Sequence, residues 1–336
     1  MKKGVLLINL GTPRSTESKD VRAYLKEFLS DKRVIDIHPV LRFLLLRLII
    51  LPFRTRKTKK SYEEIWQKEG SPLKLLTEKL TRLVKDQLKE NYEVSYAMRY
   101  GNPSIPSEIE KMRSKCSQLT VIPLYPQYAS SSTGSSVAKT YESLNHKWDP
   151  FPVKIVNSFY KHPAYTDSFA GLMKKFDTKD TKSHLLFSYH GIPERHILKS
   201  GCKVVCENCS KKNENENNKN FCYRYQCYAS TSLMAKKLGL TENQYTVSFQ
   251  SRLGKSPWIK PYTDIIIDEL YDKGIRKLWV VCPSFVSDCL ETLEEIAMEL
   301  KEQWLEKPGT SFEKVPCLNA DPVWVKSFSQ MIRDVS

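Results

Sequence analysis

One histidine stands where a sharp turn follows a predicted buried strand. His190 comes directly after the apolar run 185–188 and Tyr189, and it precedes Gly191 and Pro193, residue types that turn a chain sharply. The imidazole is therefore held at the tip of a strand, where it can accept a proton near neutral pH or bind a metal ion. A histidine at a strand end is also frequently structural, and its position alone does not separate these roles.

A second group of residues is acidic. Asp288, Glu291 and Glu295 follow the predicted strand 277–282 at i, i+3 and i+7, which places their carboxylates on one face of a predicted helix. Ser287 has the type and place of an N-cap residue. The opposite face carries an apolar core stripe: Leu290, Leu293, Ile296, Ala297 and Leu300. The acidic face is either solvated surface that compensates the helix dipole or a source of metal ligands and proton acceptors.

Five cysteines lie within 26 residues, spaced Cys202-x3-Cys206-x2-Cys209-x12-Cys222-x4-Cys227. A reducing cytosol opposes a disulfide framework, so clustered thiols are interpreted first as metal ligands. The C-x3-C-x2-C opening is close to plant-type iron–sulfur spacing, whereas structural zinc prefers two tight pairs. The spacing favours a [2Fe–2S] cluster over zinc, and unligated thiols are the third alternative.

Seven short apolar runs predict the strands that position these residues: 5–9, 94–98, 119–123, 153–157, 185–188, 245–249 and 277–282. Helical patterns separate most of them. This alternation predicts parallel sheets covered by helices on both faces, with ligands bound outside the carboxyl ends of the strands. A length of 336 residues favours two such α/β domains. We expect domains at 1–158 and 159–318, with a cysteine-rich insert at 201–227, and a C-terminal helix in 319–336 that packs back on the first domain.

The formal charge of +15 suits an anionic membrane, a nucleic acid or an acidic small molecule equally well. The most apolar stretch, residues 40–53, contains Arg42 and Arg47 and is too short to span a bilayer. It is either an ordinary buried helix or an exposed apolar lip that contacts lipid or an apolar substrate. Pro13 and a turn stand where an export signal needs a cleavage site, so we expect a cytoplasmic protein.

Two other classes are disfavoured by their missing signatures. The first strand is followed by NLGTPR, which lacks the G-x-G-x-x-G turn of a dinucleotide-binding dehydrogenase. The insert alternates Lys with Asn and Glu, whereas a nucleic-acid surface interleaves basic and aromatic residues. We therefore expect no nucleic-acid partner.

Three long motifs resemble the ferrochelatase family: LLFSYHGIPERH around the histidine, FQSRLGKSPWIKPYTD, and VVCPSFVSDCLETLEEI around the acids. LLINLGTP, EGSPL, AMRYGNP and PLYPQYASSSTGSS match in order, so that the resemblance covers nearly the whole chain. It implies two similar Rossmann-like domains with the active-site cleft between them. It also implies an enzyme that inserts Fe(II) into protoporphyrin IX, releases two protons and forms heme b. A coproporphyrin ferrochelatase or another tetrapyrrole chelatase is the alternative.

The resemblance also assigns roles to residues. His190 and Glu291 take the catalytic positions, as proton acceptors or Fe(II) ligands, while Asp288 and Glu295 form either a path for metal or protons or plain solvated surface. The motifs that line the porphyrin pocket contain Leu10, Ser71, Arg99, Tyr125 and Trp258. Because the porphyrin is poorly soluble in water and carries anionic propionates, the lip and the positive charge favour peripheral association with the inner face of the cell membrane.

Some members of this family carry a [2Fe–2S] cluster, often with ligands near the C-terminus. The C-terminal tail here offers only Cys317, so any cluster is internal. Cys227 resembles a cysteine found at this helix start where no cluster exists. The resemblance therefore implies Cys202, Cys206, Cys209 and Cys222 as the ligands, with Cys227 as the alternate.

Overall fold

The computed structural model describes the whole chain except residues 146–147, 150, 207–220, 253 and 255. Its internal contacts divide it into two units. Unit 1 comprises Met1–Tyr125, Ser130–Ser158 and Asn319–Ser336, and unit 2 comprises Pro126–Ala129 and Phe159–Leu318. The long central segment of the chain thus changes from one unit to the other after Ser158, and the C-terminal segment belongs to unit 1.

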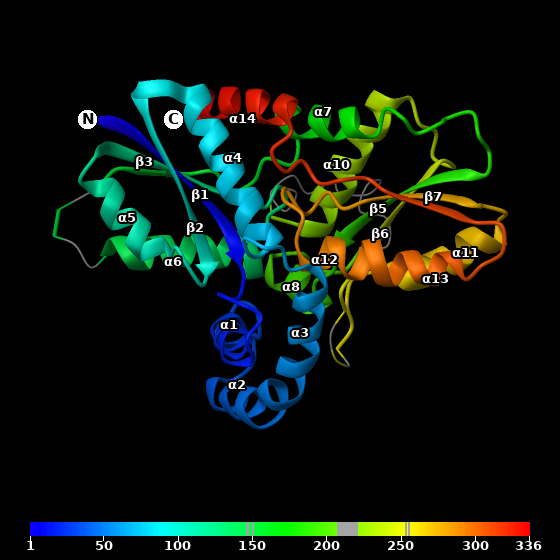
Figure 1. Cartoon of the computed structure of the whole chain (residues 1–336), viewed down its shortest axis with the longest axis horizontal. Coiled ribbons are helices and arrows are strands. Elements are labelled where there is room, and N and C mark those ends of the chain that lie inside the picture. The colour runs from blue at the N-terminus through cyan, green and yellow to red at the C-terminus, as the bar shows by residue number, and fades with distance from the viewer. Residues whose placement is uncertain (146–147, 150, 207–220, 253, 255) are drawn as a thin grey trace. The chain divides into compact units, whose positions relative to one another are not determined.

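Unit 1 is built on a parallel sheet of four strands in the order β2-β1-β3-β4 (Figure 1). The strands are β1 (Lys2–Gly11), β2 (Tyr92–Tyr100), β3 (Cys116–Pro123) and β4 (Val153–Ile155). Leu6 and Ile8 of β1 pack in one cluster with Ile109 of α5. Val5 and Leu7, which alternate onto the opposite face of the sheet, are equally buried. Both faces of the sheet are therefore covered, as a parallel sheet requires.

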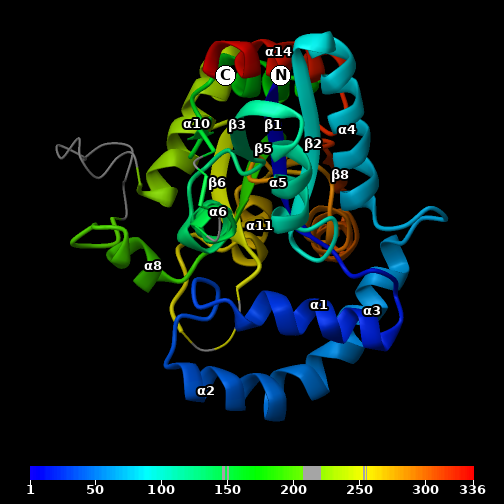
Figure 2. The ribbon, with the colours of Figure 1, turned by 90° about the vertical axis from the view of Figure 1, so that its left-hand side faces the viewer.

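The helices of unit 1 fall into two groups. Those that accompany the sheet are α4 (Pro72–Leu88), η2 (Lys89–Asn91), α5 (Ile105–Arg113), η3 (Ser130–Gly134), α6 (Ser135–Asn145) and α14 (Pro322–Val335). The others are α1 (Ser18–Ser30), α2 (Pro39–Leu44), the π-helical turn η1 (Leu45–Ile50) and α3 (Leu51–Ile65). Figure 2 shows α1, α2 and α3 gathered at one end of unit 1, at the bottom of the view. α14 packs on α4, so the C-terminal helix joins the sheet-covering group.

Unit 2 repeats this plan, with a parallel sheet of four strands in the order β6-β5-β7-β8. The strands are β5 (Ser183–His190), β6 (Tyr245–Gln250), β7 (Lys277–Val281) and β8 (Ser311–Lys314). The helices are α7 (Pro163–Leu172), α8 (Glu194–Lys199), α10 (Tyr223–Leu238), α11 (Thr263–Asp272), α12 (Leu290–Leu293), the π-helical turn η4 (Glu295–Leu300) and α13 (Lys301–Leu305). The predicted fold class, two Rossmann-like units each with a parallel sheet flanked by helices, is confirmed.

The apolar stretch 40–53 is not an ordinary buried helix. Leu46 and Leu51 anchor it to unit 1, each less than 5% exposed. Seven other apolar side chains are between 44% and 77% exposed: Val40, Leu41, Phe43, Leu44, Leu48, Ile49 and Phe53. We call these seven residues the apolar lip. Throughout the described part of the chain, no helix combines the length and the apolar character needed to cross a membrane.

Candidate active site

His190 is the last residue of β5, and its ring and backbone are both held by hydrogen bonds. The ring nitrogen Nδ1 lies 2.6 Å from the carbonyl oxygen of Gly191. Because a carbonyl can only accept, Nδ1 carries the proton, and Nε2 of the neutral ring keeps its lone pair. The backbone N–H donates to Ser284 Oγ at 3.2 Å, and the carbonyl accepts from the Tyr223 hydroxyl at 2.8 Å. The half-buried imidazole thus presents a defined acceptor nitrogen.

The turn after His190 requires glycine because other atoms approach it closely. A Cβ atom added at Gly191 would lie 2.8 Å from the carbonyl oxygen of Gln250 and 3.2 Å from the Trp258 ring. Real Cβ atoms do not come that close to backbone, so Gly191 lets the chain turn against the neighbouring strand. The same contact places Trp258, a predicted substrate-binding residue, against the turn that carries His190.

Gln250 connects the acidic residues to the end of the histidine strand. It lies opposite His190 in the parallel register of β5 and β6. Its amide nitrogen Nε2 donates to the backbone carbonyl of Glu291 at 2.9 Å and to Glu295 Oε2 at 3.2 Å. Ser251 donates a further hydrogen bond to the same carboxylate oxygen of Glu295. His190, Glu291 and Glu295 are therefore gathered within unit 2.

Glu295 differs from an ordinary surface glutamate in its proton affinity. Burial raises the pKa of its carboxyl from the usual 4.5 to about 7, and the negative charge of Glu291 adds to this rise. The hydrogen bonds from Ser251 and Gln250 act in the opposite direction but do not overcome burial. A carboxyl group that titrates near neutrality can accept or release a proton under working conditions.

The predicted continuous acidic face is wrong at its first residue. The helix begins at Leu290 with Cys289 as its N-cap, so Ser287 is not the cap and Asp288 lies before the helix. The buried carboxylate of Asp288 pairs with Lys314 of β8 and accepts a hydrogen bond from Thr292 Oγ1 at 2.8 Å. Asp288 is therefore held by residues of two other segments and does not belong to the helix that carries Glu291. The π-helical turn at Glu295 further breaks the regular i, i+3, i+7 spacing.

The predicted substrate-binding residues of unit 1 lie near the carboxyl ends of its strands and at a helix start. Leu10 and Arg99 are the penultimate residues of β1 and β2, and Tyr125 follows β3 by two residues. Ser71 is the buried N-cap of α4. Three of these residues thus come from three strands that are adjacent in the sheet.

The guanidinium of Arg99 is already paired within unit 1. It donates to Asp31 Oδ2 at 2.6 Å and to Ser135 Oγ at 2.6 Å, and 14% of its side chain is exposed. Burial of Asp31 opposes its charge, but hydrogen bonds from Ser135 and from the backbone of Arg33, together with the Arg99 charge, hold the pKa of Asp31 below its usual range. Arg99 therefore neutralises a buried carboxylate, a role that its strand-end position did not indicate.

The cysteines of the insert occupy different environments. Cys202 and Cys206 are half-buried, Cys222 is the buried N-cap of α10, and Cys209 lies outside the described residues. Cys227 is fully buried inside α10. It lies close enough to the phenols of Tyr165, Tyr189 and Tyr223 to help raise their pKa values. Among the residues that the structure describes, no three His, Cys, Asp or Glu side chains are arranged to hold a metal ion.

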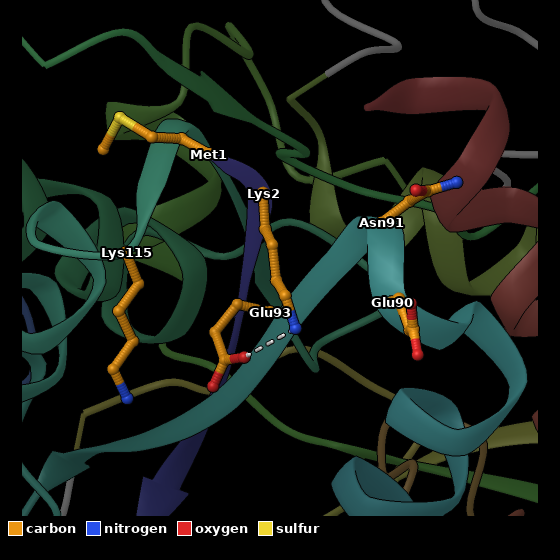
Figure 3. Close-up of a pocket in the computed structure, with 6 residues that line it drawn as sticks. All are labelled: Met1, Lys2, Glu90, Asn91, Glu93 and Lys115. Atoms are coloured by element: carbon orange, nitrogen blue, oxygen red, sulfur yellow. Dashed lines mark ion pairs between the residues drawn. The ribbon is translucent and has the colours of Figure 1, made fainter.

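A polar hollow of about 510 Å³ lies at the opposite end of the unit 1 sheet from Leu10 and Arg99. Figure 3 shows its lining residues: Met1, Lys2, Glu90, Asn91, Glu93 and Lys115. Lys2 and Glu93 stand at the amino ends of β1 and β2 and form an ion pair of 4.0 Å. In open parallel sheets ligands bind at the carboxyl ends, so this hollow is not part of the candidate active site.

Several residues in the site had no role predicted from the sequence. The Tyr223 hydroxyl is hydrogen-bonded to the His190 carbonyl and to Ser284. The side chain of Gln250 donates to the Glu291 carbonyl. A detectable signal existed for Gln250 and Ser284, because they stand one and two residues after the predicted strands 245–249 and 277–282. Tyr223 lies within the cysteine-rich insert at 201–227, where no local sequence pattern connects it to His190.

Two similar α/β units, each with a four-stranded parallel sheet, give this chain the fold of solved chelatases such as the sirohydrochlorin chelatase SirB. The whole chain superposes on SirB from Bacillus subtilis with Fe³⁺, with a TM-score of 0.56 and 11% identity over 100% of this chain and 96% of the other. It superposes on CbiX, described as the terminal enzyme for biosynthesis of siroheme in denitrifying bacteria, with a TM-score of 0.50 and 10% identity over 99% of both chains. At such identities the likeness shows the fold alone.

Sequence comparison identifies the family within this class. The ferrochelatase family model matches residues 2–335. A ferrochelatase of Legionella pneumophila is 46% identical over 334 residues, covering 99% of both chains. One of Coxiella burnetii is 44% identical over 337 residues, covering 99% of this chain and 93% of the relative. The chain belongs to the ferrochelatase family, whose members are lyases that insert a metal ion into a porphyrin, and the predicted resemblance is confirmed.

Proposed function

We propose that this enzyme inserts Fe(II) into protoporphyrin IX and forms heme b, with His190 and Glu291 as its catalytic residues. The single observation that best supports this proposal is the hydrogen bond between His190 Nδ1 and the Gly191 carbonyl, which leaves Nε2 as the ring nitrogen that can accept a proton. Gln250 holds Glu291 and Glu295 beside the same strand end. This combination suits a reaction that removes protons and admits a dication.

The chemistry assigns a task to each group. Two pyrrole N–H protons leave the macrocycle as Fe(II) enters, so the enzyme needs an acceptor close to the ring and a way to pass protons on. His190 Nε2 accepts a pyrrole proton, and Glu291 stabilises the imidazolium that results. Glu295, with its pKa near 7, relays protons toward solvent. Imidazole and carboxylate are also competent ligands for Fe(II), so the same residues can deliver the metal.

Five residues form the proposed porphyrin contact: Leu10, Ser71, Arg99, Tyr125 and Trp258. Support comes from the strand-end positions of three of them and from the contact of Trp258 with the His190 turn. An apolar and aromatic surface can hold the ring bent, which exposes the nitrogen lone pairs. We assign Arg99 a packing contact with the porphyrin and not an ion pair with a propionate, because Asp31 already neutralises its charge.

An anaerobic assay with Fe(II) tests the activity and the substrate together. Protoporphyrin IX and coproporphyrin are compared as substrates for the parent enzyme, for His190→Ala and for Glu291→Gln. Glu299→Gln, an exposed glutamate of η4, is the matched control. We expect protoporphyrin turnover that falls at least 100-fold in both site variants and stays within twofold in the control. Preference for coproporphyrin would overturn the substrate, and undiminished metalation in both site variants would overturn the mechanism.

We propose further that the protein is cytoplasmic and that the apolar lip binds the inner face of the cell membrane and collects porphyrin there. Its seven exposed apolar side chains form one connected helical segment. Residues 37–62 contain no Asp or Glu but seven Lys and Arg residues: Arg42, Arg47, Arg54, Arg56, Lys57, Lys59 and Lys60. Anionic lipid headgroups attract such charge while acyl chains accept the apolar groups.

Vesicle sedimentation tests this surface. Vesicles with about a third phosphatidylglycerol should bind the parent and release it as salt screens the charge. Leu48→Ser and Phe53→Ser should bind less while unfolding at the parent temperature, because both side chains are exposed. Leu305→Ser, an equally simple change at an exposed leucine of unit 2, is the control. Equal binding by all variants would contradict the proposal.

We also propose that Cys202, Cys206, Cys209 and Cys222 bind a [2Fe–2S] cluster, which when bound would supply one-electron redox chemistry. The donor set is all thiol, and Cys222 stands at the N-terminus of α10. Cys227 is enclosed within α10, which supports leaving it out. Freshly purified protein should absorb visible light and contain iron and sulfide, Cys202→Ser should lose both, and Cys227→Ser should keep them. Colourless protein that contains zinc would overturn the cluster.

A further inference from the structure

The backbone of His190 closes a ring of hydrogen bonds with two side chains. The His190 N–H donates to Ser284 Oγ at 3.2 Å. Ser284 Oγ and the Tyr223 hydroxyl are 2.8 Å apart, and the Tyr223 hydroxyl donates to the His190 carbonyl at 2.8 Å. The third donor must be the Ser284 hydroxyl, because the Tyr223 proton is used on the carbonyl. Each of the three groups thus donates once and accepts once around the ring.

The ring joins α10 to the ends of two strands, β5 and β7, that are neighbours in the unit 2 sheet. His190 ends β5, Tyr223 begins α10, and Ser284 follows β7. Tyr223 is 5% exposed. Because a closed directional ring admits one arrangement, it fixes the peptide units on both sides of the His190 Cα atom.

We propose that Tyr223 and Ser284 are positioning residues for His190, and that they link the cysteine-rich insert to the catalytic histidine. The proposal rests on the proposed role of His190. In this proposal neither hydroxyl contacts the substrate. Both act on the peptide units that set where the imidazole points, so removal of either lowers the rate of metalation without weakening substrate binding.

The link to the insert follows from sequence neighbours. Cys222 is the N-cap of α10 and the residue directly before Tyr223. A change at the Cys222 thiol, such as loss of a bound group, moves the first turn of α10 and with it the hydroxyl that holds His190. The insert then acts on the active site through a single peptide bond and a single hydrogen bond, without contact with the porphyrin.

A double-mutant cycle tests the positioning role. Tyr223→Phe and Ser284→Ala each remove one hydroxyl from the ring. We expect each to lower kcat about tenfold, equivalent to about 1.4 kcal/mol, with KM for porphyrin and for Fe(II) changed less than twofold. Because either change opens the ring, the kcat of the double variant should be about tenfold below that of the parent, the same loss as in each single variant, and not a hundredfold below it. Tyr189→Phe is the matched control, since its buried hydroxyl bonds to Thr231 and not to the ring.

A second readout separates this proposal from the proposed function. Protein labelled with ¹⁵N-histidine should give one sharp set of His190 imidazole signals, identified by their loss in His190→Ala. Tyr223→Phe, Ser284→Ala and Cys222→Ser should broaden or split these signals, and Tyr189→Phe should not. A parent enzyme without metalation would refute the proposed function but leave this readout intact. Multiplicative losses in the cycle, or unchanged His190 signals in Tyr223→Phe, would overturn the positioning role.

Discussion

Glu295 is the carboxyl group whose titration most directly tests the electrostatics of the site. Its pKa is raised from 4.5 to about 7. Between these two pH values the folded protein holds a proton that the unfolded chain has lost, so the free energy of unfolding falls as pH rises. A pKa difference of this size between the folded and unfolded states corresponds to about 3 kcal/mol of free energy of unfolding. This contribution is lost above pH 7.

The substitution Glu295→Gln removes this titration while keeping the side-chain shape. The amide oxygen of glutamine can still accept hydrogen bonds from Gln250 and Ser251, the partners of the carboxylate. The variant should therefore resemble the parent below pH 5 and gain on it as pH rises, by about 3 kcal/mol above pH 8. Urea unfolding of both proteins at unit steps from pH 5 to pH 9 measures the difference.

The control for this comparison is Glu299→Gln, which removes an exposed carboxylate from the same helical segment. Its stability should follow that of the parent at every pH. If the curves of Glu295→Gln and the parent are parallel from pH 5 to pH 9, Glu295 is not a buried acid with a raised pKa, and its relay role fails with it. If Glu299→Gln shows the same gain, the effect comes from net charge and not from burial.

Three further substitutions test single structural claims by urea unfolding. Lys314→Met leaves the buried carboxylate of Asp288 without its partner and should lower the free energy of unfolding by about 3–5 kcal/mol. The double variant with Asp288→Asn should recover most of this stability. An unchanged free energy of unfolding in Lys314→Met would contradict the pairing. Gly11→Ala should cost about 3 kcal/mol, because φ is +112° and the new Cβ would lie 1.8 Å from the Tyr100 carbonyl oxygen; a stable variant would contradict that conformation. Trp304→Phe should cost about 2 kcal/mol, through the hydrogen bond from Nε1 to Ser311, and an unchanged midpoint would refute it.

Much of the fold could be predicted because its main strands are buried apolar runs with clear boundaries. β8 could not, since SFEK alternates polar and apolar residues at the edge of the sheet and has no apolar run. His190 could be placed because strand, glycine and proline signals all lie within a few residues of it. These are local features, and local features are what a sequence pattern records.

The features that the sequence did not predict depend on partners that are distant in the sequence. Ser287 has the better side chain for an N-cap, yet the helix starts after Cys289, and Asp288 pairs with Lys314 of β8, 26 positions further along the chain. The pairing of Arg99 with Asp31 joins residues 68 positions apart. For the stretch 40–53 the sequence left a buried helix and an exposed apolar lip open, because an apolar pattern reports only that burial is favourable and not whether a partner exists within the same chain.

Gln250 explains how a polar active site can stay ordered at the end of a buried strand. Its two amide N–H groups bind the Glu291 carbonyl and the Glu295 carboxylate, and its amide oxygen accepts from the Ser188 hydroxyl at 2.8 Å and from the Cys282 thiol at 3.9 Å. With both donors and the oxygen engaged, the amide has one favourable orientation. Ser188 lies two residues before His190 on the same strand, so the acids are tied to that strand through one side chain. Their position relative to the imidazole is therefore tied to the register of β5 and β6.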